Sequence, residues 1–322
     1  MGRGEIELSG SWVIGDIGGT NARFAIAENG KYGQLWHVEV ARYASLRDGL
    51  TAYLNGLVPS QRPNRAALAI AGPVFGDKVA LTNHGWPFSI SELKSGLGLA
   101  SLVVVNDFAA TAMSVPHLPE GDVFLVGPAG SETRGPVGVI GPGTGLGVGS
   151  LIPNGRRWVL VPGEGGHVTL PACTQEESDI IHVLQTRFGH VSAERALSGA
   201  GLVNLYEALC SIAGIPAKPM TPADVTDHAI RGTDATCVKA FDHFCAFLGT
   251  VAGDLALTVG ATGGIFIAGG ILLRFKEAFA KSSFRQRFED KGRFGALLRG
   301  IPTRLILEES PALLGLANLD GF

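Results

Sequence analysis

The sequence is poor in charge and in cysteine, and it lacks the patterns of a nucleic-acid or zinc-binding protein. Only 17% of its 322 residues are charged, and 26 basic against 29 acidic residues leave a formal net charge of −3. Proteins that bind nucleic acid usually carry a basic stripe, so we expect no such partner. The four cysteines form no C-x-x-C pair and no Cys/His set at zinc spacing. We therefore expect reduced, mostly buried thiols and a cytoplasmic location.

Two long uncharged runs are unsuitable for crossing a membrane. Residues 255–273 contain five glycines, and residues 135–155 contain eight glycines and three prolines. A spanning helix needs about 20 mainly apolar residues with a fully hydrogen-bonded backbone. Buried strands joined by glycine loops fit these runs better. The N-terminal MGRGEIELSGSW has no apolar signal region, and we expect a soluble protein without a membrane partner.

Glycine, by contrast, is abundant, with 46 residues gathered in clusters at 18–19, 141–149, 163–166 and 269–270. Clustered glycine indicates backbone that turns with positive φ or approaches a ligand closely. The first cluster lies between expected strands at 13–17 and 23–27, and an Asn-Gly hairpin at 28–31 leads to a third strand near 35–40. VGVIGPGTGLGVGSLI (137–152) repeats this strand–turn–strand design 126 residues later. Two halves that begin alike predict duplicated mixed-sheet α/β domains with a cleft between them.

The rest of the chain reads as helices and short buried strands. We expect helices at 45–57, 176–188, 192–197, 202–209, 222–231, 235–257 and 272–280. Continuous apolar runs at 66–70, 102–105 and 265–268 are typical of strands buried on both faces. A strand at 304–307 and a helix at 311–319 close the chain.

The two glycine turns do not match the common nucleotide motifs. G-x-x-x-x-G-K-[ST] is absent, and GPGTGLG (141–147) is not G-x-G-x-x-G and opens a strand instead of a helix. A helix-dipole phosphate site is therefore excluded, which leaves backbone amides that converge on an anion. Two such turns could clamp a triphosphate, with Asp16 near a Mg²⁺ ion and Arg23 near the transferred group. The alternative is a pair of tight hairpins with glycine at positive φ.

Asn106 and Asp107 follow the buried strand at 102–105. Open α/β sheets bind ligands at the carboxyl ends of their strands, and a carboxylate there can take a proton in phosphoryl transfer. The alternative is a helix N-cap, a position that both residue types favour.

Several motifs together resemble a known family. DIGGTNAR, GPGTGLG and IAGGI resemble the phosphate-1, phosphate-2 and adenosine motifs of the sugar-kinase/actin/heat-shock superfamily. LTNHGW (81–86), VVVNDFAA (103–110), PGEGGHV (162–168), HVSAERALSGAGLVNLYEAL (190–209) and FEDKGRF (288–294) resemble bacterial ATP-dependent glucokinases of the non-ROK type. The likeness covers roughly residues 13–316. ROK kinases carry a Cys-rich zinc motif, whereas this chain has only Cys173 after GEGGH.

The resemblance implies two ribonuclease-H-like lobes of the actin/hexokinase type, with mixed sheets and an interlobe cleft. We expect a small lobe of residues 1–112 plus 303–322, a large lobe of residues 113–302, and a homodimer. The implied activity is ATP- and Mg²⁺-dependent phosphorylation of D-glucose at the 6-hydroxyl, the first step of glycolysis. Three alternatives stay open: a kinase for another hexose, an actin-like or chaperone-like ATPase, and a glucose sensor without activity.

The resemblance also assigns roles to residues. Asp107 would be the general base, and Asn106, Glu164, His167 and Glu194 would bind sugar hydroxyls, for which carboxylates and imidazole are suited. Glu194 has an alternative as N-terminal helix charge, and the 269–270 pair has one as a strand-to-helix turn. Asn83, His84 and Trp86 would shape the sugar side. The ATP residues would be Gly15, Asp16 (also the Mg²⁺ ligand, directly or through water), Ile17, Gly18, Gly19, Thr20, Asn21, Arg23, Gly141, Thr144, Gly145, Gly269 and Gly270.

Overall fold

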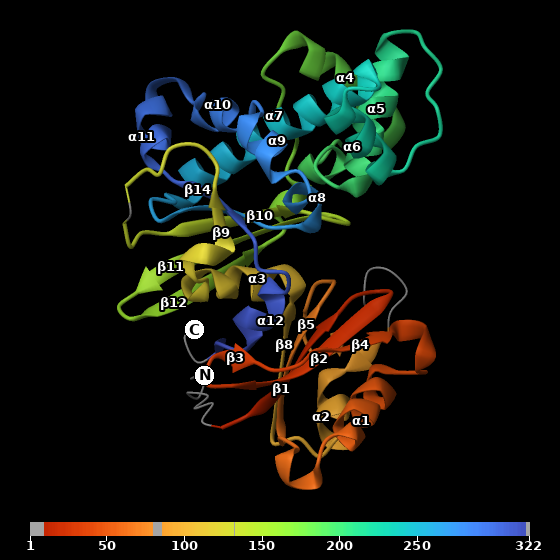
Figure 1. Cartoon of the computed structure of the whole chain (residues 1–322), viewed down its shortest axis with the longest axis vertical. Helices are drawn as coiled ribbons and strands as arrows, with labels where there is room; N and C mark the ends of the chain where they lie inside the picture. The colour runs from red at the N-terminus through yellow and green to blue at the C-terminus, as the bar shows by residue number, and fades with distance from the viewer. Residues whose placement is uncertain (1–9, 80–85, 132, 320–322) are drawn as a thin grey trace. The chain divides into compact units, whose positions relative to one another are not determined.

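A computed structural model describes residues 10–79, 86–131 and 133–319 of the chain. The chain folds into two compact units (Figure 1). The first unit comprises the chain up to Leu118, the short segment Gly155–Leu160 and the segment from Glu308 onward. The second unit comprises Pro119–Asn154 and Val161–Leu307.

The first unit is built on one mixed sheet. Its strands run in the order β3-β2-β1-β5-β8, and β4 also pairs with β2. The meander of β1, β2 and the following strands is antiparallel as expected, while β5 and β8 run parallel to β1. Asn29 (φ 52°) and Gly30 (φ 74°) give the hairpin its left-handed turn. The strands are β1 (Trp12–Ile17), β2 (Asn21–Glu28), β3 (Lys31–Tyr32), β4 (Trp36–Glu39), β5 (Arg65–Ile70) and β8 (Ser101–Asn106).

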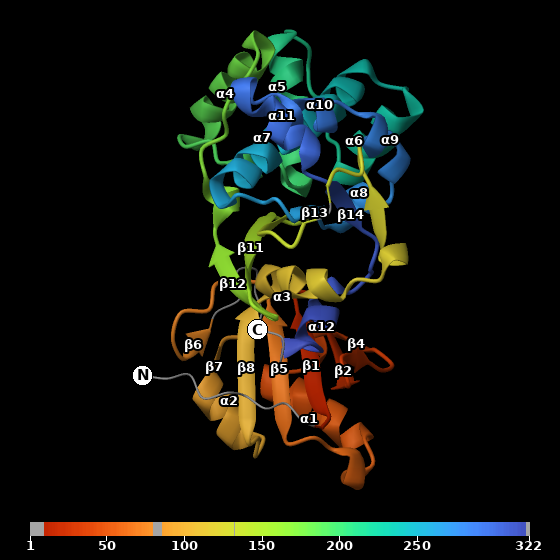
Figure 2. The same ribbon diagram turned by 90° about the vertical axis from the view of Figure 1, so that its left-hand side faces the viewer.

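Helices cover both faces of this sheet (Figure 2). Alternate residues of β1 enter two different cores: Val13 packs in the cluster with α1 and α2, and Ile14 packs in the cluster with α3 and α12. Ser45 caps α1, because its hydroxyl accepts a hydrogen bond from the amide of Asp48 (3.2 Å). The helices are α1 (Leu46–Gly56), α2 (Ile90–Gly96), α3 (Asp107–Ser114) and α12 (Pro311–Leu316), and a small ribbon adds β6 (Lys78–Val79) and β7 (Phe88–Ser89).

The second unit repeats the strand arrangement of the first. Its order is β12-β11-β10-β13-β14-β9, in which β10 and β11 form an antiparallel hairpin and β13 and β14 run parallel to β10. The closing strand, expected in the small lobe, lies in this sheet instead, because β14 finds a parallel partner in β13. The strands of this sheet are β9 (Val123–Leu125), β10 (Val137–Pro142), β11 (Leu146–Asn154), β12 (Arg157–Gly163), β13 (Gly264–Ile267) and β14 (Thr303–Ile306), and the first residues of β12 fall in the segment Gly155–Leu160 that is grouped with the first unit.

Eight helices complete the described part of the second unit. They are α4 (Gln175–Phe188), α5 (Gly199–Ile212), α6 (Pro222–Arg231), α7 (Ala235–Val259), α8 (Gly270–Leu273), α9 (Lys276–Lys281), α10 (Phe284–Glu289) and α11 (Gly295–Gly300). Two expectations were wrong. The helix expected at 192–197 is only a 3-10 turn, Ala193–Arg195, because the hydroxyl of Ser198 caps a new helix at Gly199. The helix expected at 272–280 is divided at Phe275, whose backbone (φ −131°, ψ 30°) is not helical.

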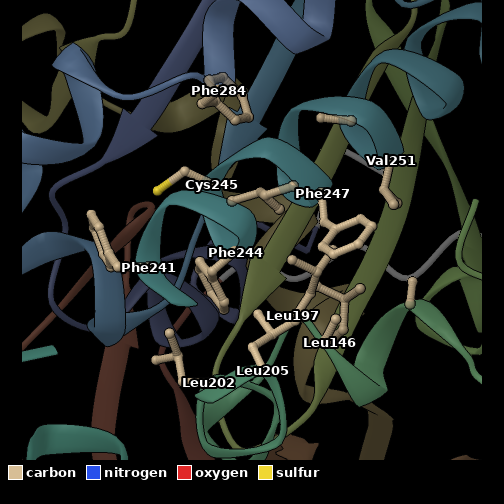
Figure 3. Close-up of a cluster of buried hydrophobic side chains, with 14 of the residues drawn as sticks. Leu146, Leu197, Leu202, Leu205, Phe241, Phe244, Cys245, Phe247, Val251 and Phe284 are labelled. Carbon is tan, nitrogen blue, oxygen red and sulfur yellow. The ribbon is translucent and has the colours of Figure 1, made fainter. Parts of the chain in front are cut away.

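The long helix α7 lies at the centre of this unit. By length and composition it could cross a membrane, but 72% of its most apolar stretch is buried inside the structure. Phe244 and Phe247 project from it toward leucines of α5 and the segment before it (Figure 3). We therefore assign α7 as the core helix of a globular unit.

Candidate active site

In the first unit, the expected general base and the first glycine turn lie at one edge of the sheet. The three parallel strands end in register, since Ile17 lies beside Ile70 and Ile70 lies beside Asn106. Neighbouring strands are about 4.8 Å apart, which places the two strand ends about 10 Å from each other. The structure thus brings the 15–23 segment and Asn106-Asp107 together at the carboxyl edge, where α/β sheets bind ligands.

Asp16 and Arg23 are directly opposite each other across the β1–β2 hairpin. One guanidinium nitrogen, Nη2, donates to Oδ2 of Asp16 (2.5 Å), and Nη1 donates to the hydroxyl of Ser310 (3.1 Å). Burial raises the pKa of Asp16, and the charge and hydrogen bond of Arg23 oppose this increase. In this structure Arg23 therefore orients the Asp16 carboxylate and neutralises its charge. The sequence predicted that both residues lie near a polyphosphate, and it did not predict this contact between them.

The surroundings of Asp16 fit a weakly held Mg²⁺ ion. Magnesium usually takes one or two carboxylates and completes its shell with water and substrate phosphates. Oδ1 of Asp16 accepts no hydrogen bond from the described residues, whereas Oδ2 is held by Arg23. Elsewhere in the described chain, no group of three His, Cys, Asp or Glu side chains could hold a metal by itself.

Gly15 and Gly145 are needed for space, whereas a Cβ on Gly143 would meet nothing within 4 Å. No described glycine at 15–19 or 141–147 has positive φ, so the interpretation as hairpins with glycine at positive φ was wrong. A Cβ on Gly15 would lie 2.8 Å from the side chain of Leu68, and one on Gly145 would lie 2.3 Å from Oε2 of Glu194. Larger residues would therefore collide with the packing beneath the turns.

Asn106 and Asp107 start α3 in different ways. The side-chain oxygen of Asn106 accepts from the amides of Phe108 (2.9 Å) and Ala109 (3.1 Å), and its amide donates to the carbonyl of Gly72 (3.2 Å). The N-cap alternative is thus confirmed for Asn106. Asp107 is the first helical residue, is half-buried, and accepts from the amide of Phe108 (2.7 Å). Its carboxylate sits at the positive end of the helix dipole.

The second glycine turn, between β10 and β11, is held by its neighbours. The amide of Gly199 at the start of α5 donates to the carbonyl of Gly143 (2.9 Å). At the other end of the turn, the amide of Leu146 donates to Oε2 of Glu194 (2.9 Å). Thr144 is exposed at the tip, while Gly141 is buried in β10. The turn is therefore a fixed loop that presents its tip to solvent.

The GEGGH motif packs on the strand that follows this turn. A Cβ on Gly166 would lie 2.0 Å from the carbonyl oxygen of Leu146, and one on Gly165 would lie 2.7 Å from Val148. Glu164 and His167 are exposed on either side of these glycines. Within the described ranges, no residue forms a hydrogen bond with either side chain, so both can bind a polar ligand.

The 269–270 pair lies against the same turn. Gly269 has φ 110°, and a Cβ there would lie 2.2 Å from the carbonyl oxygen of Pro142. The pair joins β13 to α8, which confirms the strand-to-helix turn. The second unit therefore groups the phosphate-2 turn, the GEGGH motif, Glu194 and the adenosine motif.

Comparison with known proteins places this arrangement in a family. A family model described as Glucokinase matches residues 13–320. The chain belongs to the glucokinase family. The glucokinase of Nitrobacter hamburgensis is 70% identical, with 95% of this chain and 96% of that protein covered. That of Aromatoleum aromaticum is 48% identical, with coverages of 95% and 93%.

A solved structure agrees with these relatives. A glucokinase from an Antarctic psychrotroph has a TM-score of 0.87 and 36% identity, covering 95% of this chain and 97% of that one. The expected non-ROK family and the mixed α/β fold of the hexokinase type are confirmed. The chain is an enzyme, a kinase for glucose.

Some family-matched residues lie away from the groups described above. Asn83 and His84 lie outside the described residues. Trp86 is buried, and its indole nitrogen donates to the carbonyl of Tyr43 (2.9 Å), so it supports the core of the first unit. Ser310 was missed: it contacts Arg23 from 287 residues away, and no local sequence pattern indicates such a pairing.

Proposed function

We propose that the protein transfers the γ-phosphoryl group of ATP to the 6-hydroxyl of D-glucose, with Asp107 as the general base. This proposal is based on the register of the parallel strands in the first sheet. β1, β5 and β8 end side by side, so Asp107, directly after β8, and the glycine turn after β1 lie at the same end of the sheet. In phosphoryl transfer the protein mainly positions the reactants and stabilises charge, while a carboxylate accepts the proton of the attacking hydroxyl. Proton loss to Asp107 would make the 6-oxygen a better nucleophile.

Sugar binding is proposed for four further residues. Glu164 and His167 are exposed without protein partners, Glu194 is half-buried beside them in the second unit, and Asn106 precedes the base. Carboxylates accept hydrogen bonds from hydroxyls, and imidazole and amide groups can donate to them. The set therefore offers donors and acceptors to a molecule whose hydroxyls are both.

Nucleotide binding is proposed for the glycine turns. The backbone amides of 15–20 and 141–145, with the exposed Thr20, Asn21 and Thr144, would bind phosphates. Gly269 and Gly270 would lie near the adenosine. Asp16 would hold Mg²⁺ directly or through water, and Arg23 would keep the Asp16 carboxylate in place. When bound, the ion neutralises charge on the phosphate oxygens.

A coupled assay with Asp107→Asn tests the base assignment. We expect kcat to fall by about 10²- to 10⁴-fold, the usual contribution of general base catalysis, while glucose binding changes little. Asp48→Asn, on α1, serves as a matched surface control with unchanged turnover. A kcat for Asp107→Asn near that of the control would contradict the assignment.

The same assay over a panel of hexoses separates the alternatives. Turnover with glucose above fructose, mannose and glucosamine supports glucose as the substrate. A higher kcat/KM for another hexose identifies a different sugar kinase. ATP hydrolysis that no sugar stimulates favours the chaperone-like reading, and glucose binding without turnover favours the sensor.

We also propose a cytoplasmic homodimer, on the basis of the family resemblance. Light scattering on the purified protein measures its mass directly. Twice the chain mass of 33.5 kDa is the expected result, and the monomer mass at assay concentration would contradict it.

A further inference from the structure

Glu194 links two parts of the second unit that the proposed function assigns to different substrates. It lies in the 3-10 turn Ala193–Arg195, whose backbone is held by the amide of Ala193 on the carbonyl of Val168 (2.8 Å). The hydroxyl of Ser198 also donates to the carbonyl of Glu194 (2.9 Å). The backbone of this proposed sugar ligand is therefore fixed, and its half-buried side chain extends to the phosphate-2 turn.

The carboxylate of Glu194 accepts a hydrogen bond from a backbone amide of that turn. Oε2 accepts from the amide of Leu146 at 2.9 Å, and a Cβ on Gly145 would lie 2.3 Å from the same oxygen. The side chain of Leu146 is buried in the core of this unit beside Leu197 (Figure 3), so its amide cannot turn away. A negative charge thus rests on the backbone of a turn that is proposed to bind phosphate.

This contact has an electrostatic consequence. A phosphate that approaches the turn meets a carboxylate of the same sign, and one of the amides is already used. A sugar hydroxyl that donates to Glu194 would weaken or replace the hydrogen bond between this carboxylate and the amide of Leu146. That amide would then be available to a phosphate. Binding of the two ligands would then be coupled, and such coupling is reciprocal.

We infer that Glu194 is a positioning residue that holds the phosphate-2 turn in a state unfavourable to nucleotide until a sugar hydroxyl engages its carboxylate. The inference rests on the proposed sugar role of Glu194 and adds a link from that role to the nucleotide. It makes the affinity for ATP depend on glucose through a contact inside one unit. Unproductive binding of ATP without sugar is thereby reduced.

Isothermal titration calorimetry with the Mg²⁺ complex of the β,γ-imido analogue of ATP tests this inference. Glu194→Gln keeps an oxygen for the amide of Leu146 but removes the charge. Without sugar, we expect the variant to bind the analogue roughly 5- to 50-fold more tightly than the unmodified chain, within the usual range of coupling between sites. Saturating glucose should tighten binding to the unmodified chain by a similar factor.

Glu164→Gln is the matched control. Glu164 is also a proposed sugar ligand, but its side chain is exposed and forms no hydrogen bond with the described residues of the turn. We expect this control to lose glucose affinity and to bind the analogue without sugar as the unmodified chain does. Equal or weaker binding by Glu194→Gln, relative to Glu164→Gln, would overturn the inference.

A second variant guards against misfolding of the first. Gly145→Ala keeps the charge but displaces the end of the Glu194 side chain, which is flexible enough to move. We expect glucose to improve analogue binding by this variant less than in the unmodified chain, and an undiminished effect of glucose would contradict the inference. Turnover of glucose by the unmodified chain is measured separately: its absence refutes the proposed function, whereas turnover with unchanged analogue binding by Glu194→Gln refutes the link alone.

Discussion

The Glu177→Gln substitution removes a charge at a point where four hydrogen bonds converge. Oε1 accepts from Nη1 of Arg287 (2.5 Å), and Oε2 accepts from Nη2 of Arg287 (3.2 Å) and from the amides of Cys173 (2.6 Å) and Thr174 (3.2 Å). The Glu177 side chain is 1% exposed and that of Arg287 is 12% exposed. Glutamine has nearly the same size, but it has only one oxygen and would direct an NH₂ group at these donors.

The magnitude follows from the burial of both partners. Removal of one member of a buried ion pair costs about 3–5 kcal/mol, because the other charge stays uncompensated. Arg287 keeps a hydrogen bond to the hydroxyl of Thr250 (2.9 Å), so we expect a loss of about 3–4 kcal/mol. For a domain of 150–250 residues, 1 kcal/mol shifts Tm by about 2–4 °C. The variant should therefore melt roughly 6–16 °C below the unmodified protein.

The effect should depend on pH with a definite sign. Burial tends to raise the pKa of Glu177, but Arg287 and the amide of Cys173 outweigh it and lower the pKa below the ordinary 4.5. A carboxyl with a lowered pKa in the folded state contributes stability above its unfolded pKa and loses it as the pH falls through the folded value. The difference in the free energy of unfolding between the variant and the unmodified protein should be largest near neutral pH, and it should decrease below pH 4.5.

Urea unfolding followed by circular dichroism at pH 7.5 and pH 4 measures the loss in the free energy of unfolding and its dependence on pH. Glu176→Gln is the control, because the neighbouring Glu176 is 44% exposed and its ion-pair partner Lys239 is exposed as well. A pair of this kind contributes under about 1 kcal/mol. If Glu177→Gln loses no more stability than Glu176→Gln, or loses as much at pH 4 as at pH 7.5, the reasoning is refuted.

Two further predictions concern the turns. Arg23→Met leaves Asp16 without its partner. Initial-rate kinetics should therefore give a KM for Mg-ATP about tenfold higher, equivalent to about 1.4 kcal/mol, and a KM for glucose within twofold of the unmodified value. Equal changes in both KM values would contradict the positioning role of Arg23. Gly166→Ala puts a methyl group 2.0 Å from the carbonyl of Leu146, so thermal unfolding should show a loss of about 2–3 kcal/mol or more from this overlap. Gly56→Ala, which has open space around it on α1, should instead gain up to about 1 kcal/mol.

Much of the fold could be predicted because its signals are local. The Asn29-Gly30 dipeptide selects a hairpin turn, and short apolar runs without alternation mark the parallel strands β5, β8 and β13. β5 and β13 are buried as predicted, whereas the burial predicted for β8 was wrong, because β8 is the last strand of its sheet and is only half-buried. The same runs indicated where the strands end, and therefore where Asn106 and Asp107 would meet the first glycine turn. Helix boundaries after Leu197 and around Phe275 were wrong, because capping by Ser198 and a local break outweighed the periodic pattern.

The glycine turns show how far a local pattern can be read. Their positions were predicted, but the reason for glycine at 15 and 145 is contact with side chains from β5, β2 and the turn at Glu194. Such contacts join residues far apart in the chain, and composition does not report them. The same holds for β14, whose sheet was decided by its parallel partner and not by its position near the C-terminus.

The sequence alone determined the family, the kinase activity, the strand–turn–strand repeat and most residues now proposed for the site, because these depend on motifs read in order along the chain. Only the tertiary structure decided that Arg23 contacts Ser310 and that Glu194 holds the amide of Leu146. The physical reason is distance along the chain. Hydrogen bonds between residues 48 or 287 positions apart depend on how the sheets and helices pack, and a linear pattern carries no record of that packing.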